Sequence, residues 1–335
     1  MREAMLYEKL DDHVVQCALC AHRCRIQPGK DGICGVRENR DGVLHTLVYG
    51  RAISAAVDPI EKKPLYHFYP GTTSFSIATV GCNFRCAFCQ NADISQASHE
   101  QPGWERWARD LPPEQVVELA QREGCRTIAY TYTEPTVFFE YAYDCARLAT
   151  PAGLKNVFVS NGYMTAEALD TIGPDLHAAN IDLKGSDAFY RKLCGARMQP
   201  VMDAIAKMRQ MGVWVEVTTL VIPGHNDDDE TLRSIAGFLA SVDRDMPWHI
   251  SRFMPRYKLL DALETPVAAL HRAAEIGHQA GLRYVYAGNV PGDQYEHTRC
   301  PECGATCVHR HGYTIRNMMN GARCPKCDHE LAMVI

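Results

Sequence analysis

Three cysteines within eight residues are the part of this sequence best suited to chemistry. They are spaced C-x3-C-x2-C at Cys82, Cys86 and Cys89, and the next cysteine along the chain is Cys125. A structural zinc site takes four ligands, whereas this segment supplies three. A cubane [4Fe–4S] cluster on three thiolates keeps one iron free for an outside ligand, which gives the incomplete ligation a purpose. The alternative is a zinc loop that borrows a distant fourth ligand.

The elements around the triplet indicate how it is positioned. The β-branched and aromatic run 73–80 predicts a strand that ends just before the cysteines. Six further strands are expected at 127–132, 156–160, 178–183, 213–222, 248–253 and 282–287, alternating with helices at 112–123, 136–148, 165–172, 201–211, 227–242 and 265–280. Asn226 is the expected N-cap of the helix 227–242. Regular alternation predicts a parallel sheet covered by helices, although a closed barrel and an open sheet both fit the pattern.

The triplet, with Phe88 before its third cysteine, resembles the signature of the radical SAM superfamily. The resemblance implies that S-adenosylmethionine binds the open iron and is cleaved by an electron from the cluster, giving methionine and a 5′-deoxyadenosyl radical. The segment Pro-Ile-Glu-Lys-Lys-Pro-Leu-Tyr-His-Phe at 59–68 is similar to one family, the radical SAM component of the AmmeMemoRadiSam system, related to pyruvate formate-lyase activating enzymes. That resemblance covers nearly the whole chain. It implies an α/β fold, a partial (β/α)6 barrel with an open side.

Polar residues follow successive predicted strands, and the carboxyl ends of parallel strands share one face. By resemblance, the residues that position S-adenosylmethionine are Phe88, Glu134, Ser160, Asn161, Asp182, Lys184 and Asn289. Tyr132 and Thr133 stand where related proteins have two glycines before the glutamate. Asp182 and Lys184 alternate with apolar residues, so both charges are expected to point inward, where they either pair with each other or bind the cofactor.

Two further cysteine groups flank this central region, and each is expected to bind metal. The first comprises Cys17, Cys20, Cys24 and Cys34, and the second comprises Cys300, Cys303, Cys324 and Cys327. The first group suits either structural zinc or a second Fe–S cluster. The second consists of paired C-x2-C motifs and predicts a zinc ribbon with a strand at 313–315. Cys307 makes the choice of ligands in that ribbon ambiguous.

Composition limits the remaining possibilities. The chain has 335 residues, a net charge of −5 and 15 cysteines. The charge argues against protein-wide attraction to nucleic acid, and clustered cysteines without an export signal indicate metal sites rather than disulfides. Neither a signal peptide nor an apolar membrane span is recognisable, so a cytoplasmic protein is expected. The expected domains are an N-terminal metal module at 1–42, the barrel at 43–295 and a zinc-ribbon-like module at 296–335.

The family resemblance implies a radical SAM enzyme that abstracts hydrogen from a macromolecular substrate, with protein modification in the manner of activating enzymes favoured. An RNA-modifying enzyme and a non-enzymatic zinc-binding adaptor are the alternatives. The resemblance also implies a low-potential electron donor, ferredoxin or flavodoxin, and the two namesake partner proteins of the AmmeMemoRadiSam system. His22 and Cys194 are assigned no ligand role: His22 is expected to be exposed or hydrogen-bonded, and Cys194 to be an inert thiol.

Overall fold

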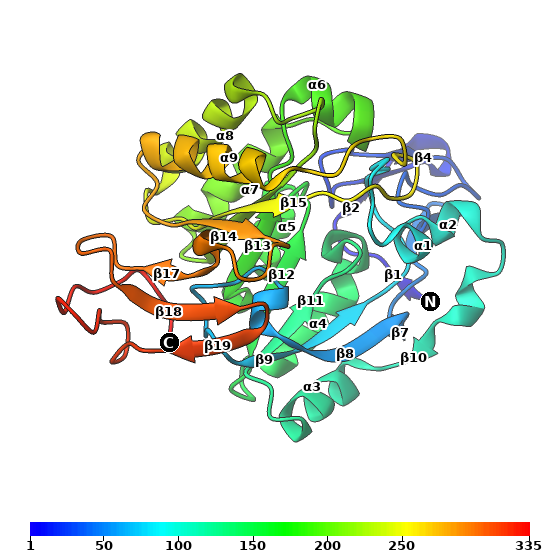
Figure 1. The fold of residues 1–335 in the computed structure, drawn as a ribbon. Helices are drawn as coiled ribbons and strands as arrows, with labels where there is room; N and C mark the ends of the chain where they lie inside the picture. Colours follow the sequence, from blue (N-terminus) through cyan, green and yellow to red (C-terminus); the bar gives the residue numbers. More distant parts are fainter.

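The computed structural model describes residues 1–335, and an eight-stranded sheet forms its centre (Figure 1). Seven strands run parallel, and β8 pairs antiparallel with β9 at one edge. In spatial order the strands are β16 (Val285–Gly288), β15 (Trp248–Arg252), β14 (Trp214–Val221), β13 (Ala178–Asp182), β12 (Lys155–Ser160), β11 (Thr127–Tyr130), β9 (Thr73–Ala78) and β8 (Ser54–Pro59). All seven strands expected from residue 73 onward are therefore present and parallel.

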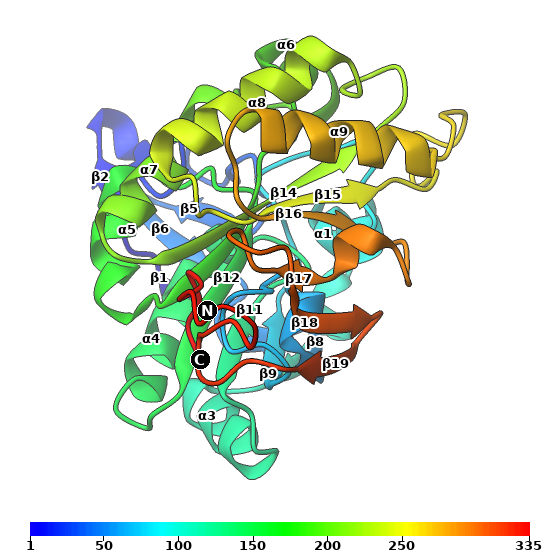
Figure 2. The same ribbon diagram turned by 60° about the vertical axis from the view of Figure 1, so that its left-hand side comes forward.

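Helices connect the parallel strands and pack against them (Figure 2). The connecting helices are α3 (Pro113–Arg122), α4 (Phe139–Ala149), α5 (Ala166–Ile172), α7 (Gln199–Gln210), α8 (Asp229–Val242) and α9 (Val267–Gln279). Shorter helices are α1 (Ala92–Ser95), α2 (Ala97–Glu100) and α6 (Asp187–Phe189), which continues into a π-helical turn at Tyr190–Cys194. Single 3₁₀ turns lie at Asp11–His13, Ile60–Lys62, Trp104–Trp107, Pro135–Phe138, Gly173–Asp175 and Gln294–Glu296.

The central sheet is open, because its edge strands β8 and β16 are not paired with each other. Six strand–helix units are followed by β16, and the antiparallel β8 extends the sheet at its other edge. The expected partial barrel of six units thus has an extra strand at each end. A closed barrel and an open sheet have the same alternation of strands and helices in sequence. Only the pairing of the edge strands distinguishes the two folds.

Small sheets precede and follow the central one. Near the N-terminus, β1 (Arg2–Glu3), β6 (Val43–Thr46) and β5 (Arg37–Arg40) form one sheet, and β2 (Tyr7–Lys9), β3 (Val15–Cys17) and β4 (Arg25–Ile26) form another. A ribbon pairs β7 (Arg51–Ala52) with β10 (Arg109–Asp110). The C-terminal sheet contains β17 (Thr298–Arg299), β18 (Thr306–His311) and β19 (Thr314–Asn317). The expected ribbon strand at 313–315 corresponds to β19.

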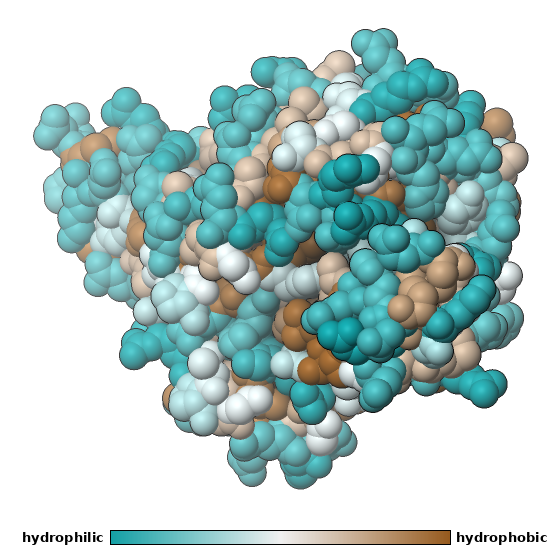
Figure 3. Space-filling view, turned by 90° about the vertical axis from the view of Figure 1, so that its left-hand side faces the viewer, coloured by the Kyte–Doolittle hydropathy of each residue, from teal (hydrophilic) through white to brown (hydrophobic).

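Both terminal regions pack on the central sheet. The N-terminal residues Val15, Cys17 and Leu19 belong to the same apolar core as the sheet and its helices. At the C-terminus, the Arg310 guanidinium donates a 2.9 Å hydrogen bond to the Tyr66 carbonyl oxygen. The face that carries the C-terminal sheet is mainly hydrophilic, with hydrophobic residues visible in narrow gaps (Figure 3). No helix is long and apolar enough to span a membrane.

One helix start differs from the prediction. The N-cap of α8 is Asp228, whose Oδ1 accepts a 2.8 Å hydrogen bond from the Thr231 amide. Asn226 was the predicted cap, but it is fully buried, and its side chain bonds backbone groups of Ile222 and Lys184. Instead of capping the helix, Asn226 therefore ties together the loops that follow β13 and β14.

Candidate functional site

The cysteine triplet lies on the loop that leaves β9, at the carboxyl end of the parallel strands. Gly81 opens this loop with a φ of +105°, a conformation that side chains with a Cβ disfavour. A Cβ at this position would lie 2.7 Å from the Val36 Cγ1 and 3.3 Å from the Cys34 carbonyl oxygen. The glycine therefore lets the N-terminal region pack directly against the start of the loop.

The three cysteine sulfurs have different polar neighbours. The Cys82 sulfur lies 3.4 Å from the Phe84 amide and 3.8 Å from the Asn161 Nδ2, and both groups donate to it. The Cys89 sulfur lies 3.2 Å from the Ser95 hydroxyl. Burial raises the pKa of the Cys82 and Cys89 thiols, so they are neutral unless a cation is bound. The protein thus supplies hydrogen-bond donors to the sulfurs of Cys82 and Cys89. These two cysteines become thiolates only when a metal is bound.

Cys86 differs because Cys194 lies against it. The neighbouring Cys194 thiol lowers the pKa of Cys86, and the pKa of Cys194 is raised correspondingly. The backbone fixes this contact, since the amides of Arg85 and Ala87 donate 2.9 Å hydrogen bonds to the carbonyls of Cys194 and Leu193. Cys194 ends the π-helical turn and is fully buried. Cys194 is isolated in the sequence and far from the triplet, so no motif spacing could have predicted that it lies beside Cys86.

Glu134 organises the loops beside the triplet. Its Oε1 accepts hydrogen bonds from the Thr136 amide, the Thr136 hydroxyl and the Ser160 hydroxyl at 3.0, 2.6 and 2.8 Å. Its Oε2 accepts one from the Asn161 amide at 2.8 Å. Burial raises the pKa of Glu134, and these donors oppose the rise. Three predicted site residues, Glu134, Ser160 and Asn161, are therefore joined in one buried network, with Asn161 also reaching the Cys82 sulfur.

Lys184 and Asp182 form an ion pair near the same loop. The Lys184 Nζ lies 2.6 Å from an Asp182 carboxylate oxygen and 6.0 Å from the centre of the Phe88 ring. Burial opposes its charge, but the carboxylate of Asp182 and the sulfur of Cys86 raise the pKa of Lys184. The Lys184 side chain is only 11% exposed, whereas that of Asp182 is 37% exposed. The ion pair that the sequence left as one option is present, beside the cysteine loop.

Asn289 lies apart from these residues. It follows β16, and its Nδ2 donates to the Ser251 hydroxyl at 2.9 Å and to the Arg252 carbonyl at 3.2 Å. It is exposed and has a φ of +62°. Its side chain thus holds the ends of β15 and β16 together rather than joining the network around Cys82.

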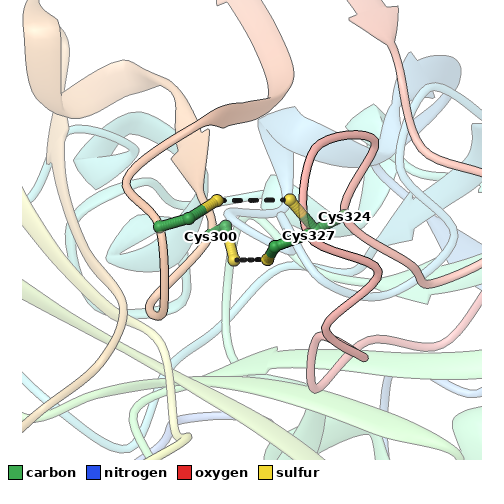
Figure 4. Close-up of side chains that lie close together, drawn as sticks. Cys300, Cys324 and Cys327 are labelled. Carbon is green, nitrogen blue, oxygen red and sulfur yellow. Dashed lines mark hydrogen bonds between the residues drawn. The ribbon is translucent and has the colours of Figure 1, made fainter.

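The C-terminal cysteines converge on one point. The sulfurs of Cys300, Cys303, Cys324 and Cys327 all lie within 4.8 Å of one another. Cys300 and Cys327 are 3.6 Å apart, as are Cys303 and Cys324 (Figure 4). Four sulfurs about 2.3 Å from a tetrahedral zinc ion would be about 3.8 Å apart, which fits this spacing. Cys307 is buried outside the group, and its thiol points to the Ala305 carbonyl.

The N-terminal cysteines lie around a shared cavity. Cys17, Cys20, Cys24 and Cys34 all line it, together with His22. The His22 Nε2 is hydrogen-bonded to the Asn83 carbonyl oxygen at 2.8 Å, as a non-ligand role predicts. The cavity therefore lies next to the loop that carries the triplet.

Sequence comparisons identify related proteins. Residues 76–235 match the model of the radical SAM superfamily. An uncharacterized protein of Methanocaldococcus jannaschii, MJ0808, is 44% identical to this chain over an alignment of 339 residues. The alignment covers the full length of both proteins. A second protein of that archaeon, MJ1632, is provisionally described as a glycyl-radical enzyme activating enzyme and is 26% identical over 60% of this chain and 75% of its own.

Solved structures show the same fold. A radical SAM methyltransferase from Sphaerobacter thermophilus superposes with a TM-score of 0.52 at 16% identity, covering 66% of this chain and 67% of that one. Streptococcus suis SuiB, bound to the precursor peptide SuiA, gives 0.51 at 13% identity, covering 64% and 48%. The fold and the family match define a radical SAM enzyme, for which a [4Fe–4S] cluster and S-adenosylmethionine are the implied cofactors. Within that superfamily, the chain belongs to the same family as MJ0808.

Proposed function

We propose that Cys82, Cys86 and Cys89 hold the [4Fe–4S] cluster at which S-adenosylmethionine is reductively cleaved. The observation that carries this proposal is the set of three cysteines on one loop at the carboxyl ends of the parallel strands. Their sulfurs do not form a group within 4.8 Å, unlike the C-terminal cysteines, so they suit a cluster of several irons better than a single ion. When bound, the cluster would supply the electron and an open iron, which the amino and carboxylate groups of S-adenosylmethionine would chelate.

The neighbouring residues have distinct tasks in this proposal. Asp182, partly exposed beside the loop, would accept hydrogen bonds from the cofactor, and Lys184 would offset the negative charge of the thiolates. Glu134 would act through its two hydrogen bonds to Ser160 and Asn161, which fix that turn, and its two to Thr136. The buried aromatic ring of Phe88 would help exclude water from the reacting centre. Asn289, just after β16, would reach the cofactor only at its far end.

We further propose a macromolecular substrate, with hydrogen abstracted from a glycine of a partner protein. The similarity to MJ1632, and the sequence resemblance to the AmmeMemoRadiSam radical SAM enzymes, support an activating-enzyme-like role. Ferredoxin or flavodoxin would supply electrons, the two AmmeMemoRadiSam partner proteins would associate with the enzyme, and the C-terminal module would hold zinc.

The decisive experiment measures 5′-deoxyadenosine formed by anaerobically reconstituted, dithionite-reduced protein given S-adenosylmethionine. We expect formation by the natural protein and a loss of at least about a hundredfold in Cys86→Ala, because one iron ligand is removed. Cys125→Ala is the matched control, since Cys125 is a buried cysteine outside all three groups. Cleavage that persists in Cys86→Ala would refute the assignment of the cluster ligands.

The substrate class can be tested with the same preparation. Each AmmeMemoRadiSam partner protein, and separately total RNA, would be added to the reduced enzyme. A glycyl radical detected by electron paramagnetic resonance on a partner protein would support the activating role. Stimulation of cofactor cleavage by RNA alone would favour the RNA-modifying alternative.

A further inference from the structure

The N-terminal cysteines surround space rather than converge on a point. Cys17 ends β3, Cys20 and Cys24 lie in the connection to β4, and Cys34 precedes β5. The cavity between them has a volume of ≈ 20 Å³, which is enough to admit a water molecule. Folding therefore brings all four thiols, separated by up to seventeen positions in sequence, to the wall of one cavity.

This spacing does not suit a single zinc ion. Zinc holds sulfur at about 2.3 Å on every side, so a closed zinc site leaves no room for water between its ligands. The C-terminal cysteines meet that condition, because their sulfurs all lie within 4.8 Å of one another. No three N-terminal cysteines form such a group, and neither do the three cysteines of the central triplet. Neither of these two groups therefore converges as the C-terminal four cysteines do.

Two unpartnered donors point to an anionic, sulfur-rich occupant. The Arg37 Nε and the Asn83 Nδ2 are buried without any hydrogen-bond partner, and both residues line the cavity. Arg37 is 2% exposed and Asn83 is 1% exposed, so water does not satisfy these groups from outside. A buried donor left unpaired costs about 1–3 kcal/mol. Inorganic sulfides and thiolates of an Fe–S cluster are acceptors that could engage both donors.

The cavity adjoins the central triplet through a single residue. Asn83, which lines the cavity, directly follows Cys82 in sequence. Its carbonyl oxygen is bonded to His22 at 2.8 Å, and its Oδ1 accepts a 2.7 Å hydrogen bond from Asn161. The Ser98 hydroxyl also donates to the Cys34 carbonyl at 3.1 Å, which ties the helix after the triplet to the N-terminal group. Asn83 thus has contacts on both sides, through its backbone carbonyl to His22 and through its side chain to Asn161.

We propose that Cys17, Cys20, Cys24 and Cys34 bind a second Fe–S cluster, which passes single electrons to the cluster on the central triplet. Cys20 and Cys24 are half-buried, so an external electron donor could approach this group, and Asn83 connects its cavity to Cys82. In each transfer a low-potential one-electron donor is oxidised, the N-terminal cluster gains and then loses that electron, and the central cluster is reduced. No bond forms or breaks, and no other reactant is consumed. The relay rests on the proposed function, whereas the presence of the second cluster does not.

Metal content tests the second cluster without any assay of activity. The triple variant Cys82→Ala, Cys86→Ala, Cys89→Ala would be purified anaerobically, and its iron, sulfide and zinc counted. We expect it to keep about half of the iron and sulfide of the natural protein, with zinc unchanged. The natural protein itself provides a measurement that needs no variant, since two clusters require about twice the iron of one. A second zinc ion in place of the second cluster would overturn the proposal.

Magnetic coupling tests the relay. Two reduced clusters joined through one residue should broaden each other's electron paramagnetic resonance signals and speed their spin relaxation. We expect this broadening in the fully reduced natural protein, and its loss both in the triple variant and in Cys20→Ser, Cys34→Ser. A spectrum equal to the sum of those of the two variants would refute the relay while leaving the second cluster in place. If cofactor cleavage failed while the iron count and the magnetic coupling were as expected, the proposed function would be refuted. The second cluster and its coupling to the central cluster would stand.

Discussion

At the scale of single residues, the most informative feature is the contact between Cys194 and Cys86. A thiol that donates to an iron-bound sulfur stabilises the electron-rich, reduced form of a cluster, because hydrogen bonds to sulfur raise its reduction potential. The backbone bonds between the triplet loop and the π-helical turn hold this thiol in place. We propose that Cys194 tunes electron transfer at the cluster, in contrast to the inert role expected from the sequence.

Replacing Cys194 should make the central cluster harder to reduce. In Cys194→Ala we expect a more negative reduction potential, since a thiol that neighbours the Cys86 sulfur is removed. An anaerobic redox titration followed by electron paramagnetic resonance measures the shift. Cys125→Ala, which removes a buried thiol elsewhere, serves as the control. An unchanged or more positive potential in Cys194→Ala would contradict this role.

His67 is a second residue with a predictable effect, in this case on stability. It is fully buried, its Nδ1 lies 2.7 Å from the Ala332 carbonyl, and burial lowers its pKa to about 4. In the unfolded chain its pKa is about 6.5, so the unfolded state binds the proton first as pH falls. Its contribution is therefore complete above about pH 6.5 and is lost progressively towards pH 4.

Between pH 7 and pH 5 this residue should reduce the free energy of unfolding by about 2 kcal/mol. His67→Gln should be less stable at pH 7 but should lose less stability on acidification than the natural protein. Urea unfolding at the two pH values measures the difference. His13→Gln, which changes a side chain that is 64% exposed, is the control. Equal acid sensitivity in the natural protein and His67→Gln would show that another group dominates.

At the scale of elements, a buried ion pair joins the N-terminal region to the central fold. Arg37 on β5 and Glu140 on α4 are 2% and 1% exposed, and the guanidinium contacts both carboxylate oxygens at 2.9 and 3.0 Å. The guanidinium also donates to the Met5 carbonyl at 2.7 Å. This pair fixes β5, and with it the segment that carries Cys34, against a helix that follows β11.

Breaking the pair from one side should be costly. Arg37→Met would leave the Glu140 carboxylate buried without its counter-charge, and we expect a loss of about 3–5 kcal/mol in the free energy of unfolding. The double variant Arg37→Met, Glu140→Met removes both charges and should be less destabilised than the single variant. Chemical unfolding followed by circular dichroism compares the two. If the double variant were the less stable of the two, the penalty of an isolated buried charge could not be the cause.

At the scale of the whole molecule, the C-terminal module closes one part of the open sheet. It contacts the segment after β8 through Arg310 and Tyr66, and Val334 forms a bridge with Phe68. The Tyr286 hydroxyl on β16 is hydrogen-bonded to Thr298 at 2.9 Å. The module thus links the two edges that do not pair with each other. Its metal site would consequently influence the central fold.

Removing one ligand should loosen this module. In Cys327→Ser we expect the loss of about one zinc ion and faster proteolysis within 296–335, because a structural zinc site needs its four ligands. Cys307→Ser is the matched control and should keep its zinc, since Cys307 lies outside the four-cysteine group. Iron content should stay the same in both. Equal loss of zinc from the two variants would mean that Cys307 is also a ligand.

The sequence by itself determined the composition of the site and the order of its elements. Local spacing specified the cysteine groups, and hydrophobic periodicity specified the alternating strands and helices, because both are properties of neighbouring residues. The charges of Asp182 and Lys184 could be placed at the end of β13 for the same reason. The sequence alone could not show that Asp228 rather than Asn226 caps α8, because this depends on what the Asn226 side chain contacts elsewhere in the fold.

Tertiary structure alone decided the features that depend on distance between remote segments. The open sheet follows from the failure of β8 and β16 to pair, and the four-cysteine group excludes Cys307 only because of where its sulfur lies. Cys194 meets Cys86 across 108 positions of sequence, and Asn83 lines a cavity formed by residues far upstream. No periodicity or spacing records such contacts. They arise when packing brings separate loops to the same end of the sheet.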